Sequence, residues 1–253
     1  MITINFNPVY FEENIALGNH MFQYCVCRLV AEKNGYNFYI PYGQYLSKCF
    51  SNLELGKNDG GIKNYYNEEN TQKFNQNIFS ISDFTNLNGY YQTDKYFIQN
   101  ENDVKSWFKV EIDNSTIKII EKYPIEKFCY IHLRGGDYKL AGHSLLPKKY
   151  FVEAIEIVKN KFPDLSFVVI TDDISLSKSY FPDLDVISND VVTDFKSLYF
   201  SKYSIISNSS FSWWSSWLSD KIITIAPDNW LNYNAKHLGC HPIDIKTSKF
   251  IYI

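Results

Sequence analysis

The sequence predicts an α/β protein built on parallel β-sheets. In the second half of the chain, apolar segments of strand length alternate with amphipathic segments of helical length. Strands that are joined through helices pair in parallel by right-handed crossovers. Polar residues also follow directly after three of the predicted strands. In α/β proteins, ligands commonly bind at the carboxyl ends of such strands.

The N-terminal part begins with a predicted strand, Ile2 to Phe6, and an irregular connection, Asn7 to Ile15. A helix is expected from Ala16 to Gly35, because its apolar residues recur at helical spacing and glycine commonly ends helices. Gly18 and Asn19 stand where this helix begins, with Asn19 as the expected N-cap. Backbone N–H groups at such a start can bind an anion, although an ordinary capped helix is the simpler interpretation of this pair.

The rest of the first half is polar and rich in Asn and Tyr. Asn37 to Pro41 is a predicted strand, whereas Gln44 to Asn88 is expected to hold short helices and loops. The aromatic segment Gly89 to Phe97 precedes a predicted helix near Asn100 to Lys109.

A linker-like stretch around Ser115 to Pro124 separates the two halves. We place the domain boundary there, which gives the domains 1–120 and 121–253. A chain of 253 residues is long enough for two small domains with their own cores.

The second half has the most regular pattern. Its predicted strands are Phe128–Ile131, Leu165–Ile170, Leu184–Ile187, Ser204–Ser207 and Lys221–Ala226. Its predicted helices are Lys148–Phe162, Ser175–Tyr180, Thr193–Tyr203 and Phe211–Leu218. Polar groups follow three of the strands, at His132 to Asp137, Thr171 to Asp173 and Asn208 to Ser210. Because the carboxyl ends of parallel strands lie along one edge, we expect these groups to face one crevice.

The stretch from Cys129 to Tyr138, C-Y-I-H-L-R-G-G-D-Y, carries the most informative of these polar groups. Arg134 offers a planar fork of donors that suits a phosphate, and Gly135 and Gly136 let a ligand approach the backbone closely. A surface turn with a structural Arg–Asp pair is the alternative interpretation of this stretch.

Two further groups point to a nucleotide diphosphate. Ser209 and Ser210 can offer hydroxyl and backbone N–H groups to a second phosphate at the start of a helix. Asp172 or Asp173 can accept a hydrogen bond from a guanine edge or a ribose hydroxyl. Helix N-capping is an equally good interpretation of Ser210 and of one of the two aspartates.

Composition and missing motifs exclude several other classes of protein. No Walker lysine motif and no G-x-G-x-x-G occur, so neither a P-loop ATPase nor a dinucleotide oxidoreductase is expected. A net charge of −3 argues against a general nucleic-acid-binding protein. The five histidines lack metal-ligand spacing, so we expect no metal cofactor.

The cysteines and the N-terminus indicate the compartment. The five cysteines form no C-x-x-C pair, which favours reduced thiols over a disulfide framework. The sequence shows neither a signal peptide nor an apolar run of transmembrane length. We therefore expect a cytoplasmic protein, with peripheral attachment to the inner face of a membrane left open.

Four segments resemble the α1,2-fucosyltransferases of glycosyltransferase family 11. His132 to Tyr138, H-L-R-G-G-D-Y, is similar to the H-x-R-R-x-D motif of that family. Three further segments agree in order and spacing: Ala16–Tyr24, Gly89–Phe97 and Ser207–Leu218. The resemblance implies a GT-B-like architecture of two Rossmann-like halves with parallel sheets. It also implies that the N-terminal half lies on the acceptor side and that the C-terminal half binds most of GDP-fucose.

The resemblance further implies a reaction, the metal-independent and inverting transfer of L-fucose from GDP-β-L-fucose. The acceptor would be the 2-hydroxyl of a galactose-containing glycan. The implied donor contacts are Gly18 and Asn19 at the phosphates, Arg134 at the diphosphate, His132 and Asp137 in the nucleotide-sugar pocket, Asp172 or Asp173 at the guanosine, and Ser209, Ser210 and Phe211 at the phosphate end. Asp137 and His143 are candidate bases for the acceptor hydroxyl, and an oxocarbenium-like path with little base assistance is the third option.

Two departures from the family pattern leave alternatives open. Gly135 replaces the second arginine of the motif, and Ile15-Ala16 replaces a glycine-rich lead-in. GDP-mannose and GDP-L-galactose are therefore alternative donors. A nucleotide-sugar or glycan-binding module without catalysis is the alternative class of protein.

Overall fold

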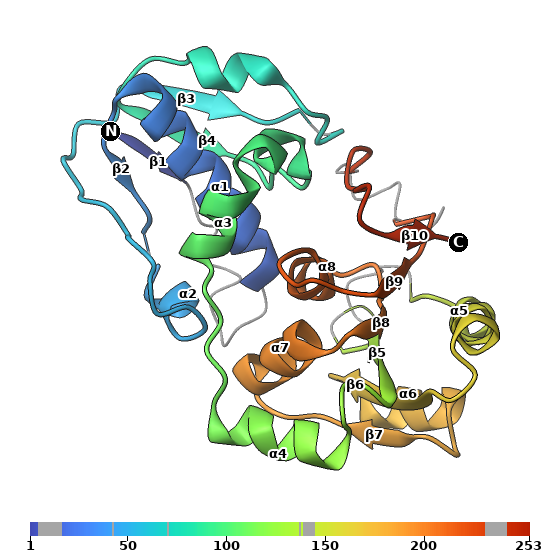
Figure 1. Cartoon of the computed structure of the whole chain (residues 1–253). Coiled ribbons are helices and arrows are strands. Elements are labelled where there is room, and N and C mark those ends of the chain that lie inside the picture. The colour runs from blue at the N-terminus through green and yellow to red at the C-terminus, as the bar shows by residue number, and fades with distance from the viewer. Residues whose placement is uncertain (5–16, 42, 70, 137, 139–144, 231–241) are drawn as a thin grey trace. The chain divides into compact units, whose positions relative to one another are not determined.

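In the computed structural model, the chain is described at residues 1–4, 17–41, 43–69, 71–136, 138, 145–230 and 242–253. The described residues divide into two compact units. Unit 1 comprises those of Met1–Glu111 and Gly239–Thr247, and unit 2 comprises those of Ile112–Leu238 and Ser248–Ile253. Each unit contains one sheet in which all strand pairs are parallel (Figure 1). The predicted α/β class with parallel sheets is confirmed.

Unit 1 is built on a four-stranded sheet of order β2-β1-β4-β3. The strands are β1 (Ile2–Ile4), β2 (Phe38–Tyr39), β3 (Asn64–Asn67) and β4 (Thr85–Asn88). The long helix α1 (Leu17–Asn34) packs against β1 (Figure 1). Most of its residues are buried. Gly35 ends α1 with a φ of +67°, a left-handed conformation that glycine adopts without strain.

Two strands of unit 1 lie where the sequence predicts only short helices and loops. In β4, Thr85 and Leu87 are buried while the asparagines between and after them are half-buried. In β3, at the edge of the sheet, three of the four residues are exposed. The prediction was wrong because strands this short and polar have almost no apolar pattern to recognise. The other elements here are α2 (Gln44–Ser47), the 3-10 turns η2 (Gln76–Ser80), η3 (Asp94–Tyr96) and η4 (Ile98–Asn100), and α3 (Glu101–Trp107).

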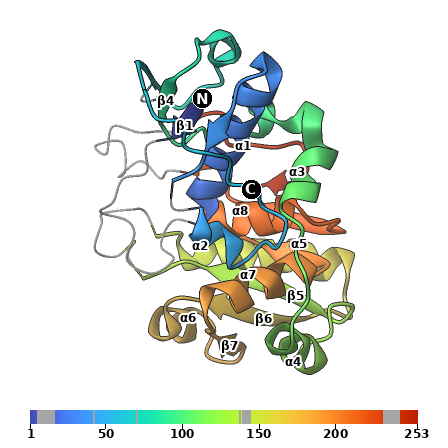
Figure 2. The same ribbon diagram turned by 90° about the vertical axis from the view of Figure 1, so that its left-hand side faces the viewer.

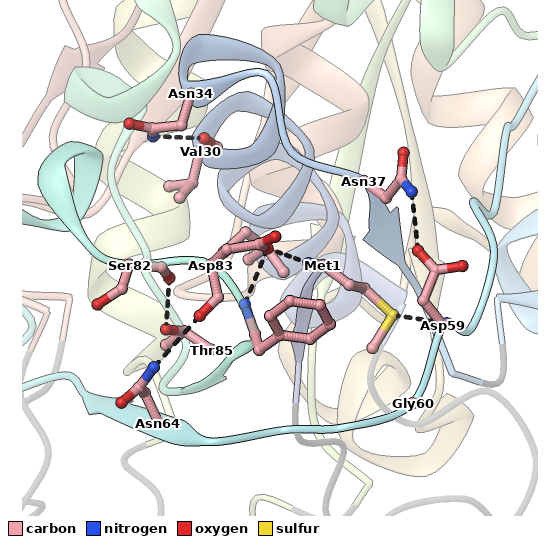
Figure 3. Close-up of polar contacts among 12 residues, drawn as sticks. Met1, Val30, Asn34, Asn37, Asp59, Gly60, Asn64, Ser82, Asp83 and Thr85 are labelled. Atoms are coloured by element: carbon pink, nitrogen blue, oxygen red, sulfur yellow. Dashed lines mark hydrogen bonds and ion pairs between the residues drawn. The ribbon is translucent and has the colours of Figure 1, made fainter.

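Several polar contacts lie at the amino end of this sheet (Figure 3). The terminal amino group of Met1 forms an ion pair with Asp83, whose carboxylate also accepts from the backbone N–H of Phe84 at 2.8 Å. Asn37 donates to the Asp59 carboxylate at 2.8 Å. The ion pair satisfies the buried amino group at the start of β1, where an unpaired group would be costly. The Asn37–Asp59 hydrogen bond is exposed and lies just before β2.

Unit 2 is built on a six-stranded sheet of order β10-β9-β8-β5-β6-β7. The strands are β5 (Phe128–Leu133), β6 (Ser166–Thr171), β7 (Asp185–Ile187), β8 (Tyr203–Ile205), β9 (Ile223–Ala226) and β10 (Ile251–Tyr252). Counted along the chain from β5 and read from β7, the strand order is 3-2-1-4-5-6, the doubly wound Rossmann order. Its direction reverses between β5 and β8, and ligands bind at such a switch point.

Helices cover both faces of this sheet (Figures 1 and 2). On one face, α5 (Lys148–Lys161) and α6 (Ile174–Tyr180) pack on the odd-numbered residues of β5. On the other, α4 (Asn114–Lys122), α7 (Val191–Phe200) and α8 (Ser210–Trp217) cover its even-numbered residues. The side chains of β5 therefore alternate between two cores, and both adjacent strands pair with it.

The prediction of a linker around Ser115 to Pro124 is wrong, because helix α4 occupies most of this stretch. The two units divide between Glu111 and Ile112 instead. Asp113 caps α4 by accepting from the backbone N–H of Thr116 at 2.9 Å, and it pairs with the buried Lys196 of α7 at 2.7 Å. The isoleucines of α4, Ile117, Ile119 and Ile120, are half-buried, and Pro124 lies beyond the end of the helix.

We predict that Asp113→Ala lowers the free energy of unfolding by about 1–2 kcal/mol, through loss of the helix cap and of the partner of a buried ammonium group. Lys196 also holds the pKa of Asp113 at about 2, so this stabilisation is present at neutral pH and is lost as pH falls from 3.8 towards 2. Urea unfolding at pH 7 measures the change. Glu121→Ala, at an exposed position of the same helix, is the control that should leave the stability unchanged.

Candidate active site

One buried hydroxyl joins the two strand ends at the switch point of unit 2. Ser207, just after β8, donates to the carbonyl oxygen of His132 at 2.8 Å and accepts from the backbone N–H of Arg134 at 3.0 Å. The hydroxyl takes the place of the backbone hydrogen bonds between β5 and β8 where these strands diverge. It therefore links the segments that follow the two strands. Tyr150 of α5 supports the same exit, because its hydroxyl donates to the carbonyl oxygen of Ile206 at 2.7 Å.

The side chain of Arg134, which follows β5, contacts a carboxylate and an aromatic ring. A terminal nitrogen of its guanidinium lies 2.8 Å from the Asp172 carboxylate, and the Arg134 side chain is 20% exposed. The other oxygen of Asp172 accepts from the backbone N–H of Gly135 at 2.7 Å. The guanidinium also lies 5.5 Å from the ring centre of Tyr138, whose hydroxyl donates to the Asn208 carbonyl at 2.9 Å. Arg134 therefore pairs with an aspartate from a different strand exit, and its guanidinium stays partly open to solvent. The alternative of a pair within the turn involves Asp137, which lies outside the described residues.

The two aspartates after β6 differ in their contacts. Asp172 holds Arg134 and the glycine turn, whereas Asp173 is the N-cap of α6 and accepts from the backbone N–H of Leu176 at 2.9 Å. The backbone N–H of Asp173 in turn donates to the buried Thr171 hydroxyl at 2.9 Å. The N-capping interpretation is confirmed for Asp173.

The backbone at Gly135 leaves no room for a side chain. A Cβ atom there would lie 2.6 Å from the Cβ of Asp173 and 3.0 Å from a methyl group of Leu176. A Cβ at Gly136 would lie 2.6 Å from the Asp172 carboxylate. The arginine that the family motif carries at position 135 therefore does not fit this chain without movement of the start of α6.

We predict that Gly135→Ala and Gly135→Arg each lower the free energy of unfolding, by about 1–3 kcal/mol for the overpacking of one Cβ atom. Restoring the arginine should not raise the affinity for GDP, because the crowded turn also carries Arg134. Thermal unfolding and calorimetric titration with GDP measure the two effects. An arginine variant that is as stable as the wild type and binds GDP more tightly would contradict this geometry.

His132 is the last residue but one of β5, and not part of the turn after it as the sequence suggested. It pairs in register with Ile170, and its ring lies 5.4 Å from that of Phe211. Burial lowers its pKa to about 4, although the nearby Asp172 carboxylate raises it; Arg134 acts in the same direction as burial. The ring is therefore neutral at pH 7, and its Nδ1 is buried without a hydrogen-bond partner among the described residues.

We predict that acid weakens the fold through His132. In the unfolded chain this histidine titrates near 6.5, so between pH 6.5 and 4 only the unfolded chain binds the proton. The free energy of unfolding should fall by about 1–2 kcal/mol between pH 7 and 5 from this group. The loss should be smaller by that amount in His132→Asn, measured by urea unfolding at both pH values. His20, whose pKa is also about 4, is unchanged in both proteins and cancels.

Helix α8 begins beside the same point. Ser209 is its N-cap residue, and the Ser209 side chain makes no capping hydrogen bond to the first turn of the helix. Ser210 is the first helical residue, and Phe211 follows with its ring against Phe195 and His132. Three buried tryptophans anchor the rest of α8 in the core: Trp213, Trp214 and Trp217. Ser209 and Ser210 therefore lie at the start of a helix, as the sequence predicts.

In unit 1, Gly18 and Asn19 lie inside the first turn of α1, because the helix already includes Leu17. Asn19 is therefore not the N-cap, contrary to the expectation from sequence. Its side-chain oxygen accepts from Gln92 at 2.7 Å. The expectation failed because the capping preference of asparagine cannot locate a helix start to within two residues.

Several predicted features fall outside the described residues: Asp137, His143 and the connection from Asn7 to Ile15. Sequence reasoning missed Ser207 and the ring of Tyr138, although both lie in the motifs that it singled out. A serine at a strand end is too common to be noticed without the strand pairing. In the described part of the chain, no group of histidine, cysteine and acidic side chains is arranged to hold a metal ion. No helix in that part is long and apolar enough to cross a membrane.

Comparison with known proteins identifies the family. The sequence model of glycosyl transferase family 11 matches residues 10–253. The chain belongs to this family. An alpha-1,2-colitosyltransferase from Escherichia coli is 30% identical over 184 residues, which span 66% of this chain and 62% of that protein. The matched region is therefore less than two thirds of that relative's length.

A solved structure shares the fold of the chain. A mutant of Arabidopsis thaliana FUT1 in complex with GDP superposes with a TM-score of 0.50 at 11% identity, covering 97% of this chain and 74% of that one. The fucosyltransferase NodZ from Bradyrhizobium gives a TM-score of 0.43 at 12% identity, covering 86% and 93%. The fold of the chain is GT-B-like, with two Rossmann-like units, as the motifs imply.

Proposed function

We propose that the chain is an inverting glycosyltransferase that moves L-fucose from GDP-β-L-fucose to the 2-hydroxyl of a galactoside, forming an α1,2 linkage. One observation supports this proposal most. At the switch point of a Rossmann-ordered sheet, Arg134 lies beside the start of α8, and Ser207 ties the two chain exits. Membership of glycosyltransferase family 11 supports the reaction class.

In this proposal unit 2 binds the donor. The Arg134 guanidinium and the first-turn amides of α8 offer positive charge and N–H donors to the two phosphates. Ser209 and Ser210 contact the phosphate end, with Phe211 beside them, and Asp172 or Asp173 meets the guanosine. His132, neutral and buried behind this surface, shapes the pocket. Gly18 and Asn19 of unit 1 contact the phosphates.

The proposed reaction is a single displacement. The acceptor hydroxyl oxygen forms a bond to C1 of the sugar from the face opposite to the diphosphate, and the bond from C1 to the phosphate oxygen breaks. The configuration at C1 inverts, and GDP leaves with the bonding electron pair. Arg134 and the helix amides stabilise the charge that develops on the leaving diphosphate. The hydroxyl proton passes to a base, for which Asp137 and His143 are the proposed residues.

A second donor has specific support. The relative from Escherichia coli is named for colitose, a 3-deoxy form of L-fucose, so a GDP-colitose donor is the first alternative. GDP-mannose and GDP-L-galactose follow, because Gly135 replaces the second arginine of the family motif. A binding module without catalysis would bind these nucleotides and release no GDP from them.

The test is calorimetric titration of the purified chain with GDP, GDP-fucose, GDP-colitose and GDP-mannose, followed by product analysis with galactosides. We expect GDP to bind and one donor to be turned over. Arg134→Ala should weaken GDP binding about 10–100-fold, because a hydrogen-bonded charge pair with phosphate is lost. Arg134→Lys should retain part of the affinity, since it keeps the charge but not the planar fork.

Lys202→Ala serves as the charge-matched control, because that exposed lysine pairs with Glu126 at a distance of 3.2 Å. It should bind GDP as the wild type does. Equal loss of affinity in Lys202→Ala and Arg134→Ala would mean that binding depends on net charge and not on this site. Normal turnover by Arg134→Ala would refute the phosphate role.

A further inference from the structure

Two of the sequence segments singled out above meet in unit 1. Gln23, in the second turn of α1, donates through its side-chain nitrogen to the carbonyl oxygen of Gly89 at 2.7 Å. One turn earlier in the helix, Asn19 accepts from the side chain of Gln92 at 2.7 Å. The loop that follows β4, Gly89 to Gln92, is therefore attached to the first two turns of α1 at both of its ends.

A single carboxylate holds the middle of this loop. Glu68 follows β3, and its carboxylate accepts from the backbone N–H of Tyr90 at 2.7 Å and of Tyr91 at 2.9 and 3.0 Å. Its own backbone N–H donates to the carbonyl oxygen of Asn88 at 2.8 Å, which continues the pairing of β3 with β4. The loop after β4 is thus fixed by the residue after β3.

The loop conformation is closely constrained around Glu68. A Cβ atom at Gly89 would lie 2.5 Å from the Cβ of Glu68 and 2.9 Å from the ring of Tyr91. Tyr91 has a φ of +55° and is fully buried, and its hydroxyl has no hydrogen-bond partner among the described residues. A non-glycine residue in this region of the backbone map is strained, and such strain persists only where the surroundings hold it.

The surroundings of Glu68 contain aromatic hydroxyls. Among the described residues, the phenols of Tyr66, Tyr91 and Tyr96 interact with it electrostatically. Burial raises the pKa of Glu68 to about 7, against the two backbone hydrogen bonds that lower it. The loop amides are therefore the principal partners of this carboxylate in the described structure.

We propose that Glu68 is a positioning residue, whose carboxylate sets the loop Gly89–Gln92 so that Gln92 holds Asn19 in the orientation that donor binding requires. The inference rests on the proposed function, in which Asn19 contacts the donor phosphates. Glu68 touches no reacting atom in this scheme. It acts through two backbone amides and one side-chain pair.

The first arm of the test needs no activity. Hydrogen exchange is measured by NMR at the backbone amides of Tyr90 and Tyr91 and at the side-chain amide of Gln92. In Glu68→Ala, exchange should be faster at all three, by at least about tenfold at the two backbone amides, because their acceptor is gone. Glu68→Gln keeps a carbonyl acceptor and should lie between Glu68→Ala and the wild type. Glu69→Ala, at the exposed neighbouring carboxylate, should leave all three unchanged.

The second arm is a double-mutant cycle on kcat and KM for the GDP-sugar. Glu68→Ala and Asn19→Ala should each raise the donor KM. In the double variant, the factor by which KM rises should be at least about fivefold smaller than the product of the two single factors. Glu68 and Asn19 lie on different elements, so this coupling must pass through the loop. A general loss of folding would instead lower the active fraction, and therefore kcat, in each variant.

The outcomes separate the two proposals. Unchanged exchange at the Gln92 side chain in Glu68→Ala would overturn the positioning role, whatever the activity. Multiplicative effects in the cycle would overturn it as well. If the wild type binds no GDP, the proposed function is wrong. Faster exchange in Glu68→Ala would then show that Glu68 orders this loop but has no role in donor binding. That result also refutes the inference.

Discussion

The hydroxyl of Ser207 is the contact on which the candidate site depends most. Where β5 and β8 end, the chain leaves the sheet in two directions, and the backbone groups of His132 and Arg134 lose their neighbours. Ser207 satisfies one acceptor and one donor at once, at 2.8 and 3.0 Å. An unsatisfied buried group costs about 1–3 kcal/mol, so this small side chain is what allows the strands to separate there. Arg134 and the start of α8 lie beside the place where β5 and β8 separate.

The strands and helices of unit 2 were largely predictable from sequence, because their apolar runs are buried on both faces. Cys129 and Tyr130 are neighbours in sequence, yet they enter opposite cores, and both are fully buried. Runs of this kind indicate a parallel strand without any need for tertiary information. The same logic placed Arg134 and the glycines at a strand exit.

Elements whose residues are mostly polar could not be predicted in this way. Helix α4 is fixed by Asp113 and Lys196, which are 83 residues apart in the chain, and β3 and β4 are fixed by pairing with each other. Such contacts leave no local pattern. The same limit applied to Ser207 and Glu68. Their partners are backbone groups, which occur at every residue, so no residue type in the sequence indicates these contacts.

The crowding at Gly135 has a consequence for how this member of the family can change. Its backbone lies directly against Asp173, which is also the cap of α6, so arginine at this position is destabilising unless the turn before α6 changes as well. A lineage that acquired the arginine would also need compensating substitutions in that turn. Descendants of this chain are therefore expected to retain a single guanidinium at the site and to adapt donor selectivity through other positions.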